Sequence, residues 1–216
     1  RYPGLDRVED RSRFTYGMKT GLYAYDGSRA DVFLGQSLRF VENDNPFPNG
    51  SGLSRQKSDF VGQINALYQE LYGVNYRFQI NSDDMSSRRH ELDAFAHWDV
   101  LQVNTRYLFA DGLEGTDIEE SREQIEGAVG LFLNQRWRLR GQALYDLGVD
   151  DGLREAAIGI DYFGCCVSVS LTAERNLTDD ASGDSGTELM LRLGLKGLGG
   201  FETSDRGRWG GRTQLD

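Results

Sequence analysis

The sequence lacks any long run of apolar residues, although 38% of its 216 residues are hydrophobic. A membrane-spanning helix needs roughly 20 consecutive apolar residues, so a helical membrane protein is excluded. It also lacks an excess of basic charge, because its formal net charge is −10 and its pI about 4.8. Nucleic-acid binding requires a basic surface for the phosphates, so a nucleic-acid partner is excluded as well.

Proline is absent after Pro48, and lysine occurs only at Lys19, Lys57 and Lys196. A chain that avoids proline over most of its length keeps its backbone N–H groups available, as long helices or a continuous sheet require. The chain opens with Arg1 rather than methionine and shows no secretory signal, so we expect a mature or cut piece of a protein.

Hydrophobic periodicity decides between helix and sheet. From Asp59 onward, apolar residues recur at every second position, which is strand spacing, and no long stretch carries a helical stripe. The sequence therefore predicts an all-β fold with about eleven strands. The expected strands are Arg13–Tyr25, Ala30–Val41, Asp59–Leu67, Leu71–Asn81, Arg88–Trp98, Val100–Phe109, Glu123–Leu133, Trp137–Leu147, Arg154–Tyr162, Cys166–Arg175 and Thr187–Lys196.

These strands are longer than the usual ~5–6 residues and match the ~9–11 residues of a tilted strand that crosses a bilayer. Short turns and longer polar loops alternate between them. The short turns are Asp26–Arg29, Tyr68–Glu70, Trp98–Asp99, Asn134–Arg136 and Phe163–Cys165, and the loops are Glu42–Ser58, Ser82–Ser87, Asp111–Arg122, Gly148–Leu153 and Asn176–Gly186. This alternation is typical of antiparallel outer-membrane barrels, with short periplasmic turns and long outer loops.

The two faces of the expected strands differ in chemistry. Aromatic residues lie beside the short turns on the apolar face, as in an interfacial girdle: Tyr72, Trp98, Trp137 and Tyr162. The opposite face holds Arg77, Gln79, Gln102, Asn104, Arg106, Glu126, Arg138, Arg140, Glu155, Asp161, Glu174 and Arg192. A sandwich core could not hold so many charges, whereas a wet barrel lumen could. The alternative is the solvated face of a soluble sheet.

An odd number of strands indicates part of a barrel, because bacterial single-chain barrels close with an even number. We expect residues 1–200 to be the C-terminal part of an outer-membrane β-barrel domain, cut within an outer loop. Residues 201–216 are expected to form a polar periplasmic tail.

The two cysteines, Cys165 and Cys166, are adjacent and lie at a short turn. Neighbouring side chains on an extended segment point to opposite sides, so we expect the two thiols to diverge rather than bond to each other. If oxidised, each would pair with a cysteine outside this chain. The alternative is a pair of reduced, inert fillers.

Catalytic and metal-binding signals are weak. The two histidines, His90 and His97, are expected on opposite faces of one strand, with no zinc spacing around them. A Ser–His–Asp arrangement would need a motif that the sequence does not show. Asp179, Asp180 and Asp184 fail the EF-hand spacing and are read as a solvated acidic loop. No catalytic residue, metal or cofactor is therefore assigned.

Several segments together carry a family resemblance. They are Tyr2–Asp10 followed by Tyr16-Gly17, Val32–Phe40, the Cys-Cys pair near the last hairpin, and Leu195–Gly199. In this order they resemble LptD, the family of LPS-assembly outer-membrane proteins also called the organic solvent tolerance family. The resemblance spans nearly the whole chain, as the C-terminal part of a larger barrel.

The resemblance implies that the barrel inserts lipopolysaccharide (LPS) into the outer leaflet of a Gram-negative outer membrane. It implies an LptE-like lipoprotein plug, periplasmic LPS-bridge proteins, the barrel-assembly machinery and the lipid bilayer as partners. Cys165 and Cys166 would form disulfides to an N-terminal periplasmic region. The last strand would form a lateral gate, with gate residues Leu189, Leu191, Leu193, Gly194 and Leu195.

Other function classes remain open from the residues alone. One is a fragment of a passive porin or substrate-specific channel, which explains the strands but not the cysteines. Another is a soluble β-sandwich binding domain or a membrane-embedded hydrolase, which would need a dry core or a catalytic cluster.

Overall fold

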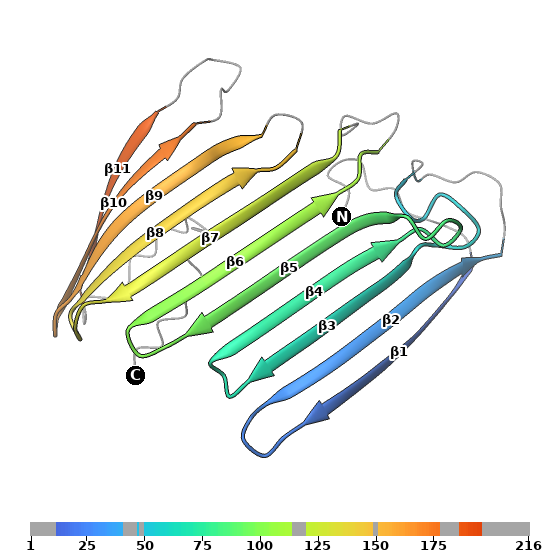
Figure 1. Cartoon of the computed structure of the whole chain (residues 1–216), viewed down its shortest axis with the longest axis horizontal. Helices are drawn as coiled ribbons and strands as arrows, with labels where there is room; N and C mark the ends of the chain where they lie inside the picture. Colours follow the sequence, from blue (N-terminus) through green and yellow to red (C-terminus); the bar gives the residue numbers. More distant parts are fainter. Residues whose placement is uncertain are drawn as a thin grey trace.

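A computed structural model describes residues 12–40, 47, 50–113, 120–148, 151–177 and 186–195. Within these residues eleven strands form one antiparallel sheet in which neighbours in sequence are neighbours in space (Figure 1). The strands are β1 (Arg13–Tyr23), β2 (Arg29–Arg39), β3 (Phe60–Tyr68), β4 (Tyr72–Ile80), β5 (Ser87–His97), β6 (Leu101–Ala110), β7 (Arg122–Phe132), β8 (Trp137–Asp146), β9 (Gly152–Phe163), β10 (Val167–Asn176) and β11 (Thr187–Leu195). No helix in these ranges has the length and apolar character needed to cross a membrane.

The prediction of an all-β fold with eleven strands is confirmed, and most strand ends agree within two residues. One small difference matters for the cysteines: β10 begins at Val167, whereas the sequence predicted Cys166 as its first residue. The Gly164 N–H donates to the Val167 carbonyl at 2.8 Å, which closes a hairpin with Cys165 and Cys166 as its two central residues. The cysteines therefore belong to the turn and not to the strand.

The sheet is open. β1 is hydrogen-bonded only to β2 and β11 only to β10 among the described residues, and Figure 1 places these two strands at opposite edges. Because the strands alternate in direction, the connections β1–β2, β3–β4, β5–β6, β7–β8 and β9–β10 share one end of the sheet. The longer connections share the other end.

Strand register keeps the two faces chemically separate across the sheet. Tyr107 of β6 pairs with Leu92 and Ile125, whereas its neighbour Arg106 pairs with Asp93 and Glu126. Directly paired residues point to the same face, so one face is apolar and the other polar. The predicted inward set, from Arg77 on β4 to Arg192 on β11, lies on the polar face by this register.

The apolar face is not covered by any described part of the chain. Leu144, 8% exposed, is the only buried hydrophobic residue in the described ranges, and Leu191 is 62% exposed. A soluble sandwich would bury such a face against a second layer. The uncovered apolar face does not fit the alternative of a soluble sandwich, and strands of nine to twelve residues fit a bilayer crossing, as expected for the barrel.

Two outward-facing glycines have different surroundings. The ring of Phe78 lies over Gly62, its register partner, so that a Cβ added at Gly62 would collide with the ring. A Cβ added at Gly127 would meet nothing within 4 Å. An aromatic ring that covers a strand glycine restores the packing that the glycine lacks.

We expect Gly62→Ala to destabilise the folded barrel by about 1–3 kcal/mol, because the new methyl group displaces Phe78. Gly127→Ala is the matched control and should be neutral or slightly stabilising. The measurement is the temperature at which the full-length protein loses its compact band on semi-native gels. Equal shifts for the two variants would contradict this account.

Candidate functional site

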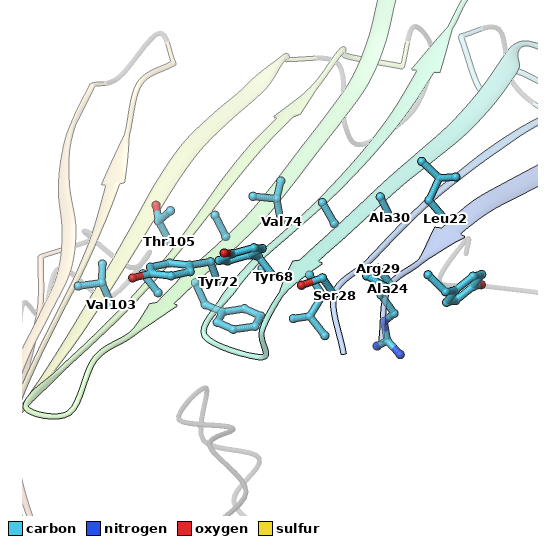
Figure 2. A pocket seen from close by; sticks show the side chains of 17 residues that line it. Leu22, Ala24, Ser28, Arg29, Ala30, Tyr68, Tyr72, Val74, Val103 and Thr105 are labelled. Atoms are coloured by element: carbon cyan, nitrogen blue, oxygen red, sulfur yellow. The ribbon is translucent and has the colours of Figure 1, made fainter. Parts of the chain in front are cut away.

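The apolar face bears a hollow of about 750 Å³ near the short-turn ends of β1 to β6 (Figure 2). Its floor is a row of paired small residues on adjacent strands, running from Ala30 through Ala66, Val74 and Ala94 to Thr105. Tyr68 and Tyr72 lie beside each other and line the hollow, with ring centroids 6.3 Å apart.

The expected aromatic girdle is present at the short-turn end. Trp98 packs edge-on against Tyr72 with centroids 5.9 Å apart, and Trp137 packs against Tyr162 at 4.9 Å. These residues share the apolar face. Rings at this height place one edge of the apolar band at a membrane–water interface.

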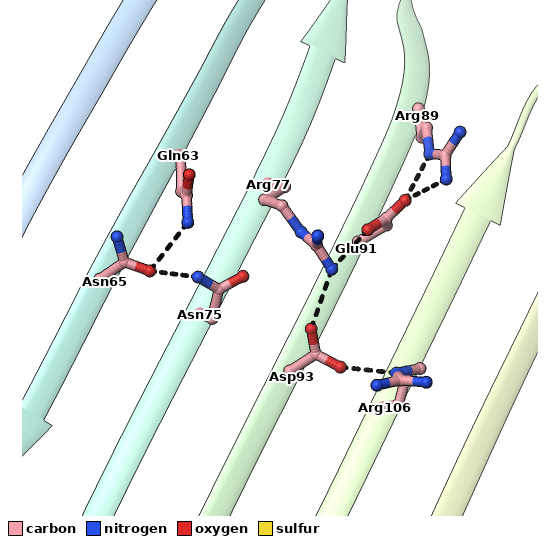
Figure 3. Close-up of polar contacts among 8 residues, drawn as sticks. All are labelled: Gln63, Asn65, Asn75, Arg77, Arg89, Glu91, Asp93 and Arg106. Carbon is pink, nitrogen blue, oxygen red and sulfur yellow. Dashed lines mark hydrogen bonds and ion pairs between the residues drawn. The ribbon is translucent and has the colours of Figure 1, made fainter. Parts of the chain in front are cut away.

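The polar face is organised by ion pairs between neighbouring strands (Figure 3). The Arg77 guanidinium contacts Glu91 at 2.7 Å and Asp93 at 3.1 Å, and Asp93 also accepts a hydrogen bond from Arg106 at 2.6 Å. Arg89 pairs with Glu91 on the same strand. The arginine side chains are about half exposed, so this ladder faces water rather than a dry core.

A second cluster on the polar face is centred on Asp161 of β9. Its side chain is 4% exposed and lies 2.8 Å from Arg138 and 2.7 Å from Arg140, both on β8. The Ser170 hydroxyl of β10 donates to the other carboxylate oxygen at 2.7 Å. The sequence places these residues on one face, but their convergence on one carboxylate depends on the register of three strands.

A third cluster lies at the long-loop end, where residues 50–59 fold onto β2 to β4. Gln79 donates to Asp59 at 2.8 Å, and Arg39 donates to the Leu53 carbonyl at 3.0 Å. Asp59 and Arg39 are both 8% exposed. Sequence reasoning treated Glu42–Ser58 only as an outer loop and missed this buried polar contact, which has no local motif.

The two histidines lie on opposite faces of β5, as predicted. On the apolar face, His90 stacks on Tyr76 at 5.8 Å, and its Nδ1 lies 2.5 Å from the Tyr76 hydroxyl. On the polar face, His97 packs against Phe95 at 4.8 Å. In the described ranges no three His, Cys, Asp or Glu side chains are grouped so as to hold a metal ion. Asp179, Asp180 and Asp184 lie outside the described residues.

Cys165 and Cys166 are both exposed free thiols, and their sulfur atoms lie 3.3 Å apart. The expectation that the two thiols diverge is therefore wrong. It assumed an extended segment, whereas the tight hairpin turn brings the two side chains together. The two sulfur atoms therefore occupy almost the same position at the short-turn end of the sheet.

The expected gate residues lie on β11, an edge strand that pairs with β10 and with no other described strand. Leu189, Leu191, Leu193 and Leu195 face the apolar side and are 51–70% exposed. Gly194 faces the polar side opposite Ser168, whose hydroxyl occupies the space that a Cβ would need. Gly194 thus allows close pairing with β10. Residues 196–216, including the expected tail, lie outside the described residues.

A single sheet with one uncovered apolar face, one polar face of paired charges and alternating turns and loops defines part of an outer-membrane β-barrel. The sequence model of the family described as "LPS transport system D" matches residues 1–162. The chain therefore belongs to the LptD family and is an outer-membrane protein. Membership of this family decides against the alternatives that the residues alone left open, namely a porin or channel fragment, a soluble β-sandwich and a membrane-embedded hydrolase.

Relatives from three bacteria agree with this assignment, and each is named LPS-assembly protein LptD. The protein of Aeromonas salmonicida is 26% identical over 217 residues, which are 96% of this chain and 26% of the relative. The Idiomarina loihiensis protein is 25% identical, with 83% of this chain and 24% of the relative covered. The Acinetobacter baumannii protein is 24% identical, with 93% and 25% covered. The chain thus spans about a quarter of the length of these relatives.

Replacing Asp161 by asparagine should destabilise the barrel by about 3 kcal/mol or more, because it leaves Arg138 and Arg140 without their shared carboxylate. Asp93→Asn, in the exposed ladder, is the matched control and should cost at most about 1 kcal/mol. Denaturant unfolding of the purified full-length protein in detergent measures both. If Asp93→Asn destabilised the protein as much as Asp161→Asn, burial of the Asp161 ion pairs would not explain the loss of stability.

Proposed function

We propose that this chain is the C-terminal part of a barrel that inserts LPS into the outer leaflet of the outer membrane. The observation that carries the proposal is the outer edge of β11, which pairs with no other described strand and where the polar and apolar faces of the sheet meet. LPS has a large polar part and apolar acyl chains. A strand edge that opens would let the polar part travel along the polar face while the acyl chains pass directly into the bilayer.

The polar face suits the polar part of this cargo. Part of its charge is paired across strands, as in the Arg77–Glu91–Asp93–Arg106 ladder, whose arginines are about half exposed to water. Transport of this kind needs no bond to be made or broken in the barrel. We therefore assign the chain no enzymatic activity.

The proposal extends to partners. A lipoprotein plug similar to LptE would occupy the polar interior and cover the exposed arginines of the ladder. Periplasmic LPS-bridge proteins would deliver the lipid at the short-turn end, and the barrel-assembly machinery would insert the barrel. LPS and the surrounding lipid bilayer are the remaining contacts.

We propose that Leu189, Leu191, Leu193, Gly194 and Leu195 form one side of the lateral gate, opposite the first strand of the complete barrel. In the described residues β11 pairs with β10 along its whole length, from Thr187 to Leu195. The β10–β11 pairing should therefore stay closed while the outer edge of β11 separates.

A disulfide between β11 and the first strand of the complete barrel should block the appearance of new LPS at the cell surface. The matched control is a disulfide between Thr172→Cys and Met190→Cys, which are direct partners on β10 and β11 and lie outside the proposed gate residues. This control should leave export unchanged, because it locks a pair that does not open. The measurement is surface LPS after induction of each cross-linked protein, and normal export with the outer seam cross-linked would refute the gate.

Cys165 and Cys166 are proposed to tether an N-terminal periplasmic region by disulfides. Their position at a short turn supports this, since short turns face the periplasm in outer-membrane barrels. Each tether would close a very long chain loop, worth on the order of 4–5 kcal/mol in the loop-entropy view. Because the two sulfurs lie 3.3 Å apart, either tether would hold that region at the same point.

We therefore expect Cys165→Ser and Cys166→Ser to be tolerated singly, and the double variant to lose assembly and surface LPS. Non-reducing gel mobility of the full-length protein, read beside surface LPS level, is the measurement. Ser168→Ala, close to the turn but without a thiol, is the control. A double variant that exports LPS at the normal rate would leave the pair without this role.

A further inference from the structure

Strands β8 to β11 lie side by side at one edge of the sheet (Figure 1), and their polar face carries a cluster of arginine side chains. Arg138 on β8 pairs in register with Asp161 on β9, and Asp161 pairs with Ser170 on β10. Ser170 pairs in turn with Arg192 on β11. Arg140 lies one row nearer the long loops, and its guanidinium reaches both Asp161 and the Ser170 hydroxyl. These five residues form the seam cluster.

The seam cluster carries more positive than negative charge. Its three guanidinium groups face one carboxylate, that of Asp161, which leaves a formal charge of +2. Arg138 at 2.8 Å, Arg140 at 2.7 Å and the Ser170 hydroxyl at 2.7 Å already contact this carboxylate. Asp161 is two strands away from Arg192, which is roughly 9–10 Å at the usual strand spacing. Asp161 therefore does not neutralise Arg192.

Arg192 is the open end of the seam cluster. Its side chain is exposed and has no hydrogen-bond or ion-pair partner among the described residues. Two rows nearer the long loops, Glu174 and Glu188 are direct partners on the same face of β10 and β11. Two facing carboxylates repel an anion, whereas a guanidinium attracts one. An anionic group at this edge of the sheet would therefore be held at the height of Arg192.

The other two arginines of the cluster are fixed in place. The Arg138 guanidinium lies over the rings of Phe132 and Phe163, at 5.7 and 5.4 Å from their centroids. Arg140 also donates to the Thr172 hydroxyl at 3.1 Å, and its side chain is 10% exposed. Charges that are already ordered lose little conformational freedom when a ligand binds. They add a steady positive potential beside the mobile Arg192 side chain.

We propose that Arg192, supported by Arg138 and Arg140, binds a phosphate group of the transported lipid. The inference rests on the proposed function and names the part of LPS that meets the gate strand. A guanidinium matches the geometry of a phosphate and binds it through two parallel hydrogen bonds. On the same strand, Leu191 and Leu193 face the apolar side. A lipid at the open edge would thus place its phosphate on Arg192 and its acyl chains against these leucines.

The test is equilibrium binding of lipid A, the phosphorylated membrane anchor of LPS, to the purified full-length protein in detergent. Arg192→Gln should weaken this binding about three- to tenfold, because a charged hydrogen-bonding group is lost. Arg192→Lys keeps the positive charge and should recover part of the loss. Arg136→Gln is the matched control, because Arg136 is an exposed arginine in the turn between β7 and β8, outside the cluster. It should bind lipid A as the unmodified protein does.

Lipid A from which the phosphates have been removed separates the phosphate from the rest of the lipid. The unmodified protein should bind it about three- to tenfold more weakly than lipid A, and Arg192→Gln should cause no further loss. Equal binding of the two lipids by the unmodified protein would overturn the site, and so would an equal loss in Arg136→Gln. This comparison of lipids does not depend on the folding of any variant.

Semi-native gels establish that each variant is folded before lipid is added. If Arg192 instead pairs with an acidic side chain of an adjacent strand or of a partner protein, Arg192→Gln will lower the temperature at which the compact band is lost and leave lipid A binding unchanged. That result would also overturn the site. The proposed function fails by a different observation, which is normal LPS export with the outer seam cross-linked.

Discussion

The structure depends on one constraint: in hydrocarbon, every backbone N–H and C=O must be hydrogen-bonded within the protein. Consecutive antiparallel strands satisfy it locally, because each inner strand pairs with the strand before and after it, and the absence of proline after Pro48 keeps the backbone N–H groups available for these ladders. Among the described strands, β1 and β11 are the two that have a partner strand on one side only. In hydrocarbon the outer backbone groups of these two strands also need partners, which closure of a barrel provides.

The same strands must satisfy two solvents. Outward side chains meet lipid and are not covered by the described part of the chain, whereas many inward charges are paired with neighbours on adjacent strands. Two versions of this solution occur. The Arg77–Asp93–Arg106 ladder is open to water, and the Asp161 cluster is closed around one carboxylate. The amphiphilic cargo that we propose would meet a polar and an apolar surface on the two sides of this wall.

The strands, their order and their two faces were predictable because a period of two residues is a local property of the sequence. The alternation of turns and loops is likewise read directly from the chain. The family resemblance added a function that no single residue pattern carried. The prediction for the cysteine side chains was wrong because it extended strand geometry by one residue into a turn, where side-chain directions follow the hairpin instead.

What the sequence by itself determined is therefore the set of short-range features: strand spacing, apolar and polar faces, the aromatic girdle and the family. Only the tertiary structure decided which residues meet across strands. The three residues around Asp161, the fold of residues 50–59 onto Asp59, the ring of Phe78 over Gly62 and the hollow above Ala66 all depend on inter-strand register. Register is set by many weak pair contacts along two strands at once, so no local pattern in a single sequence contains it.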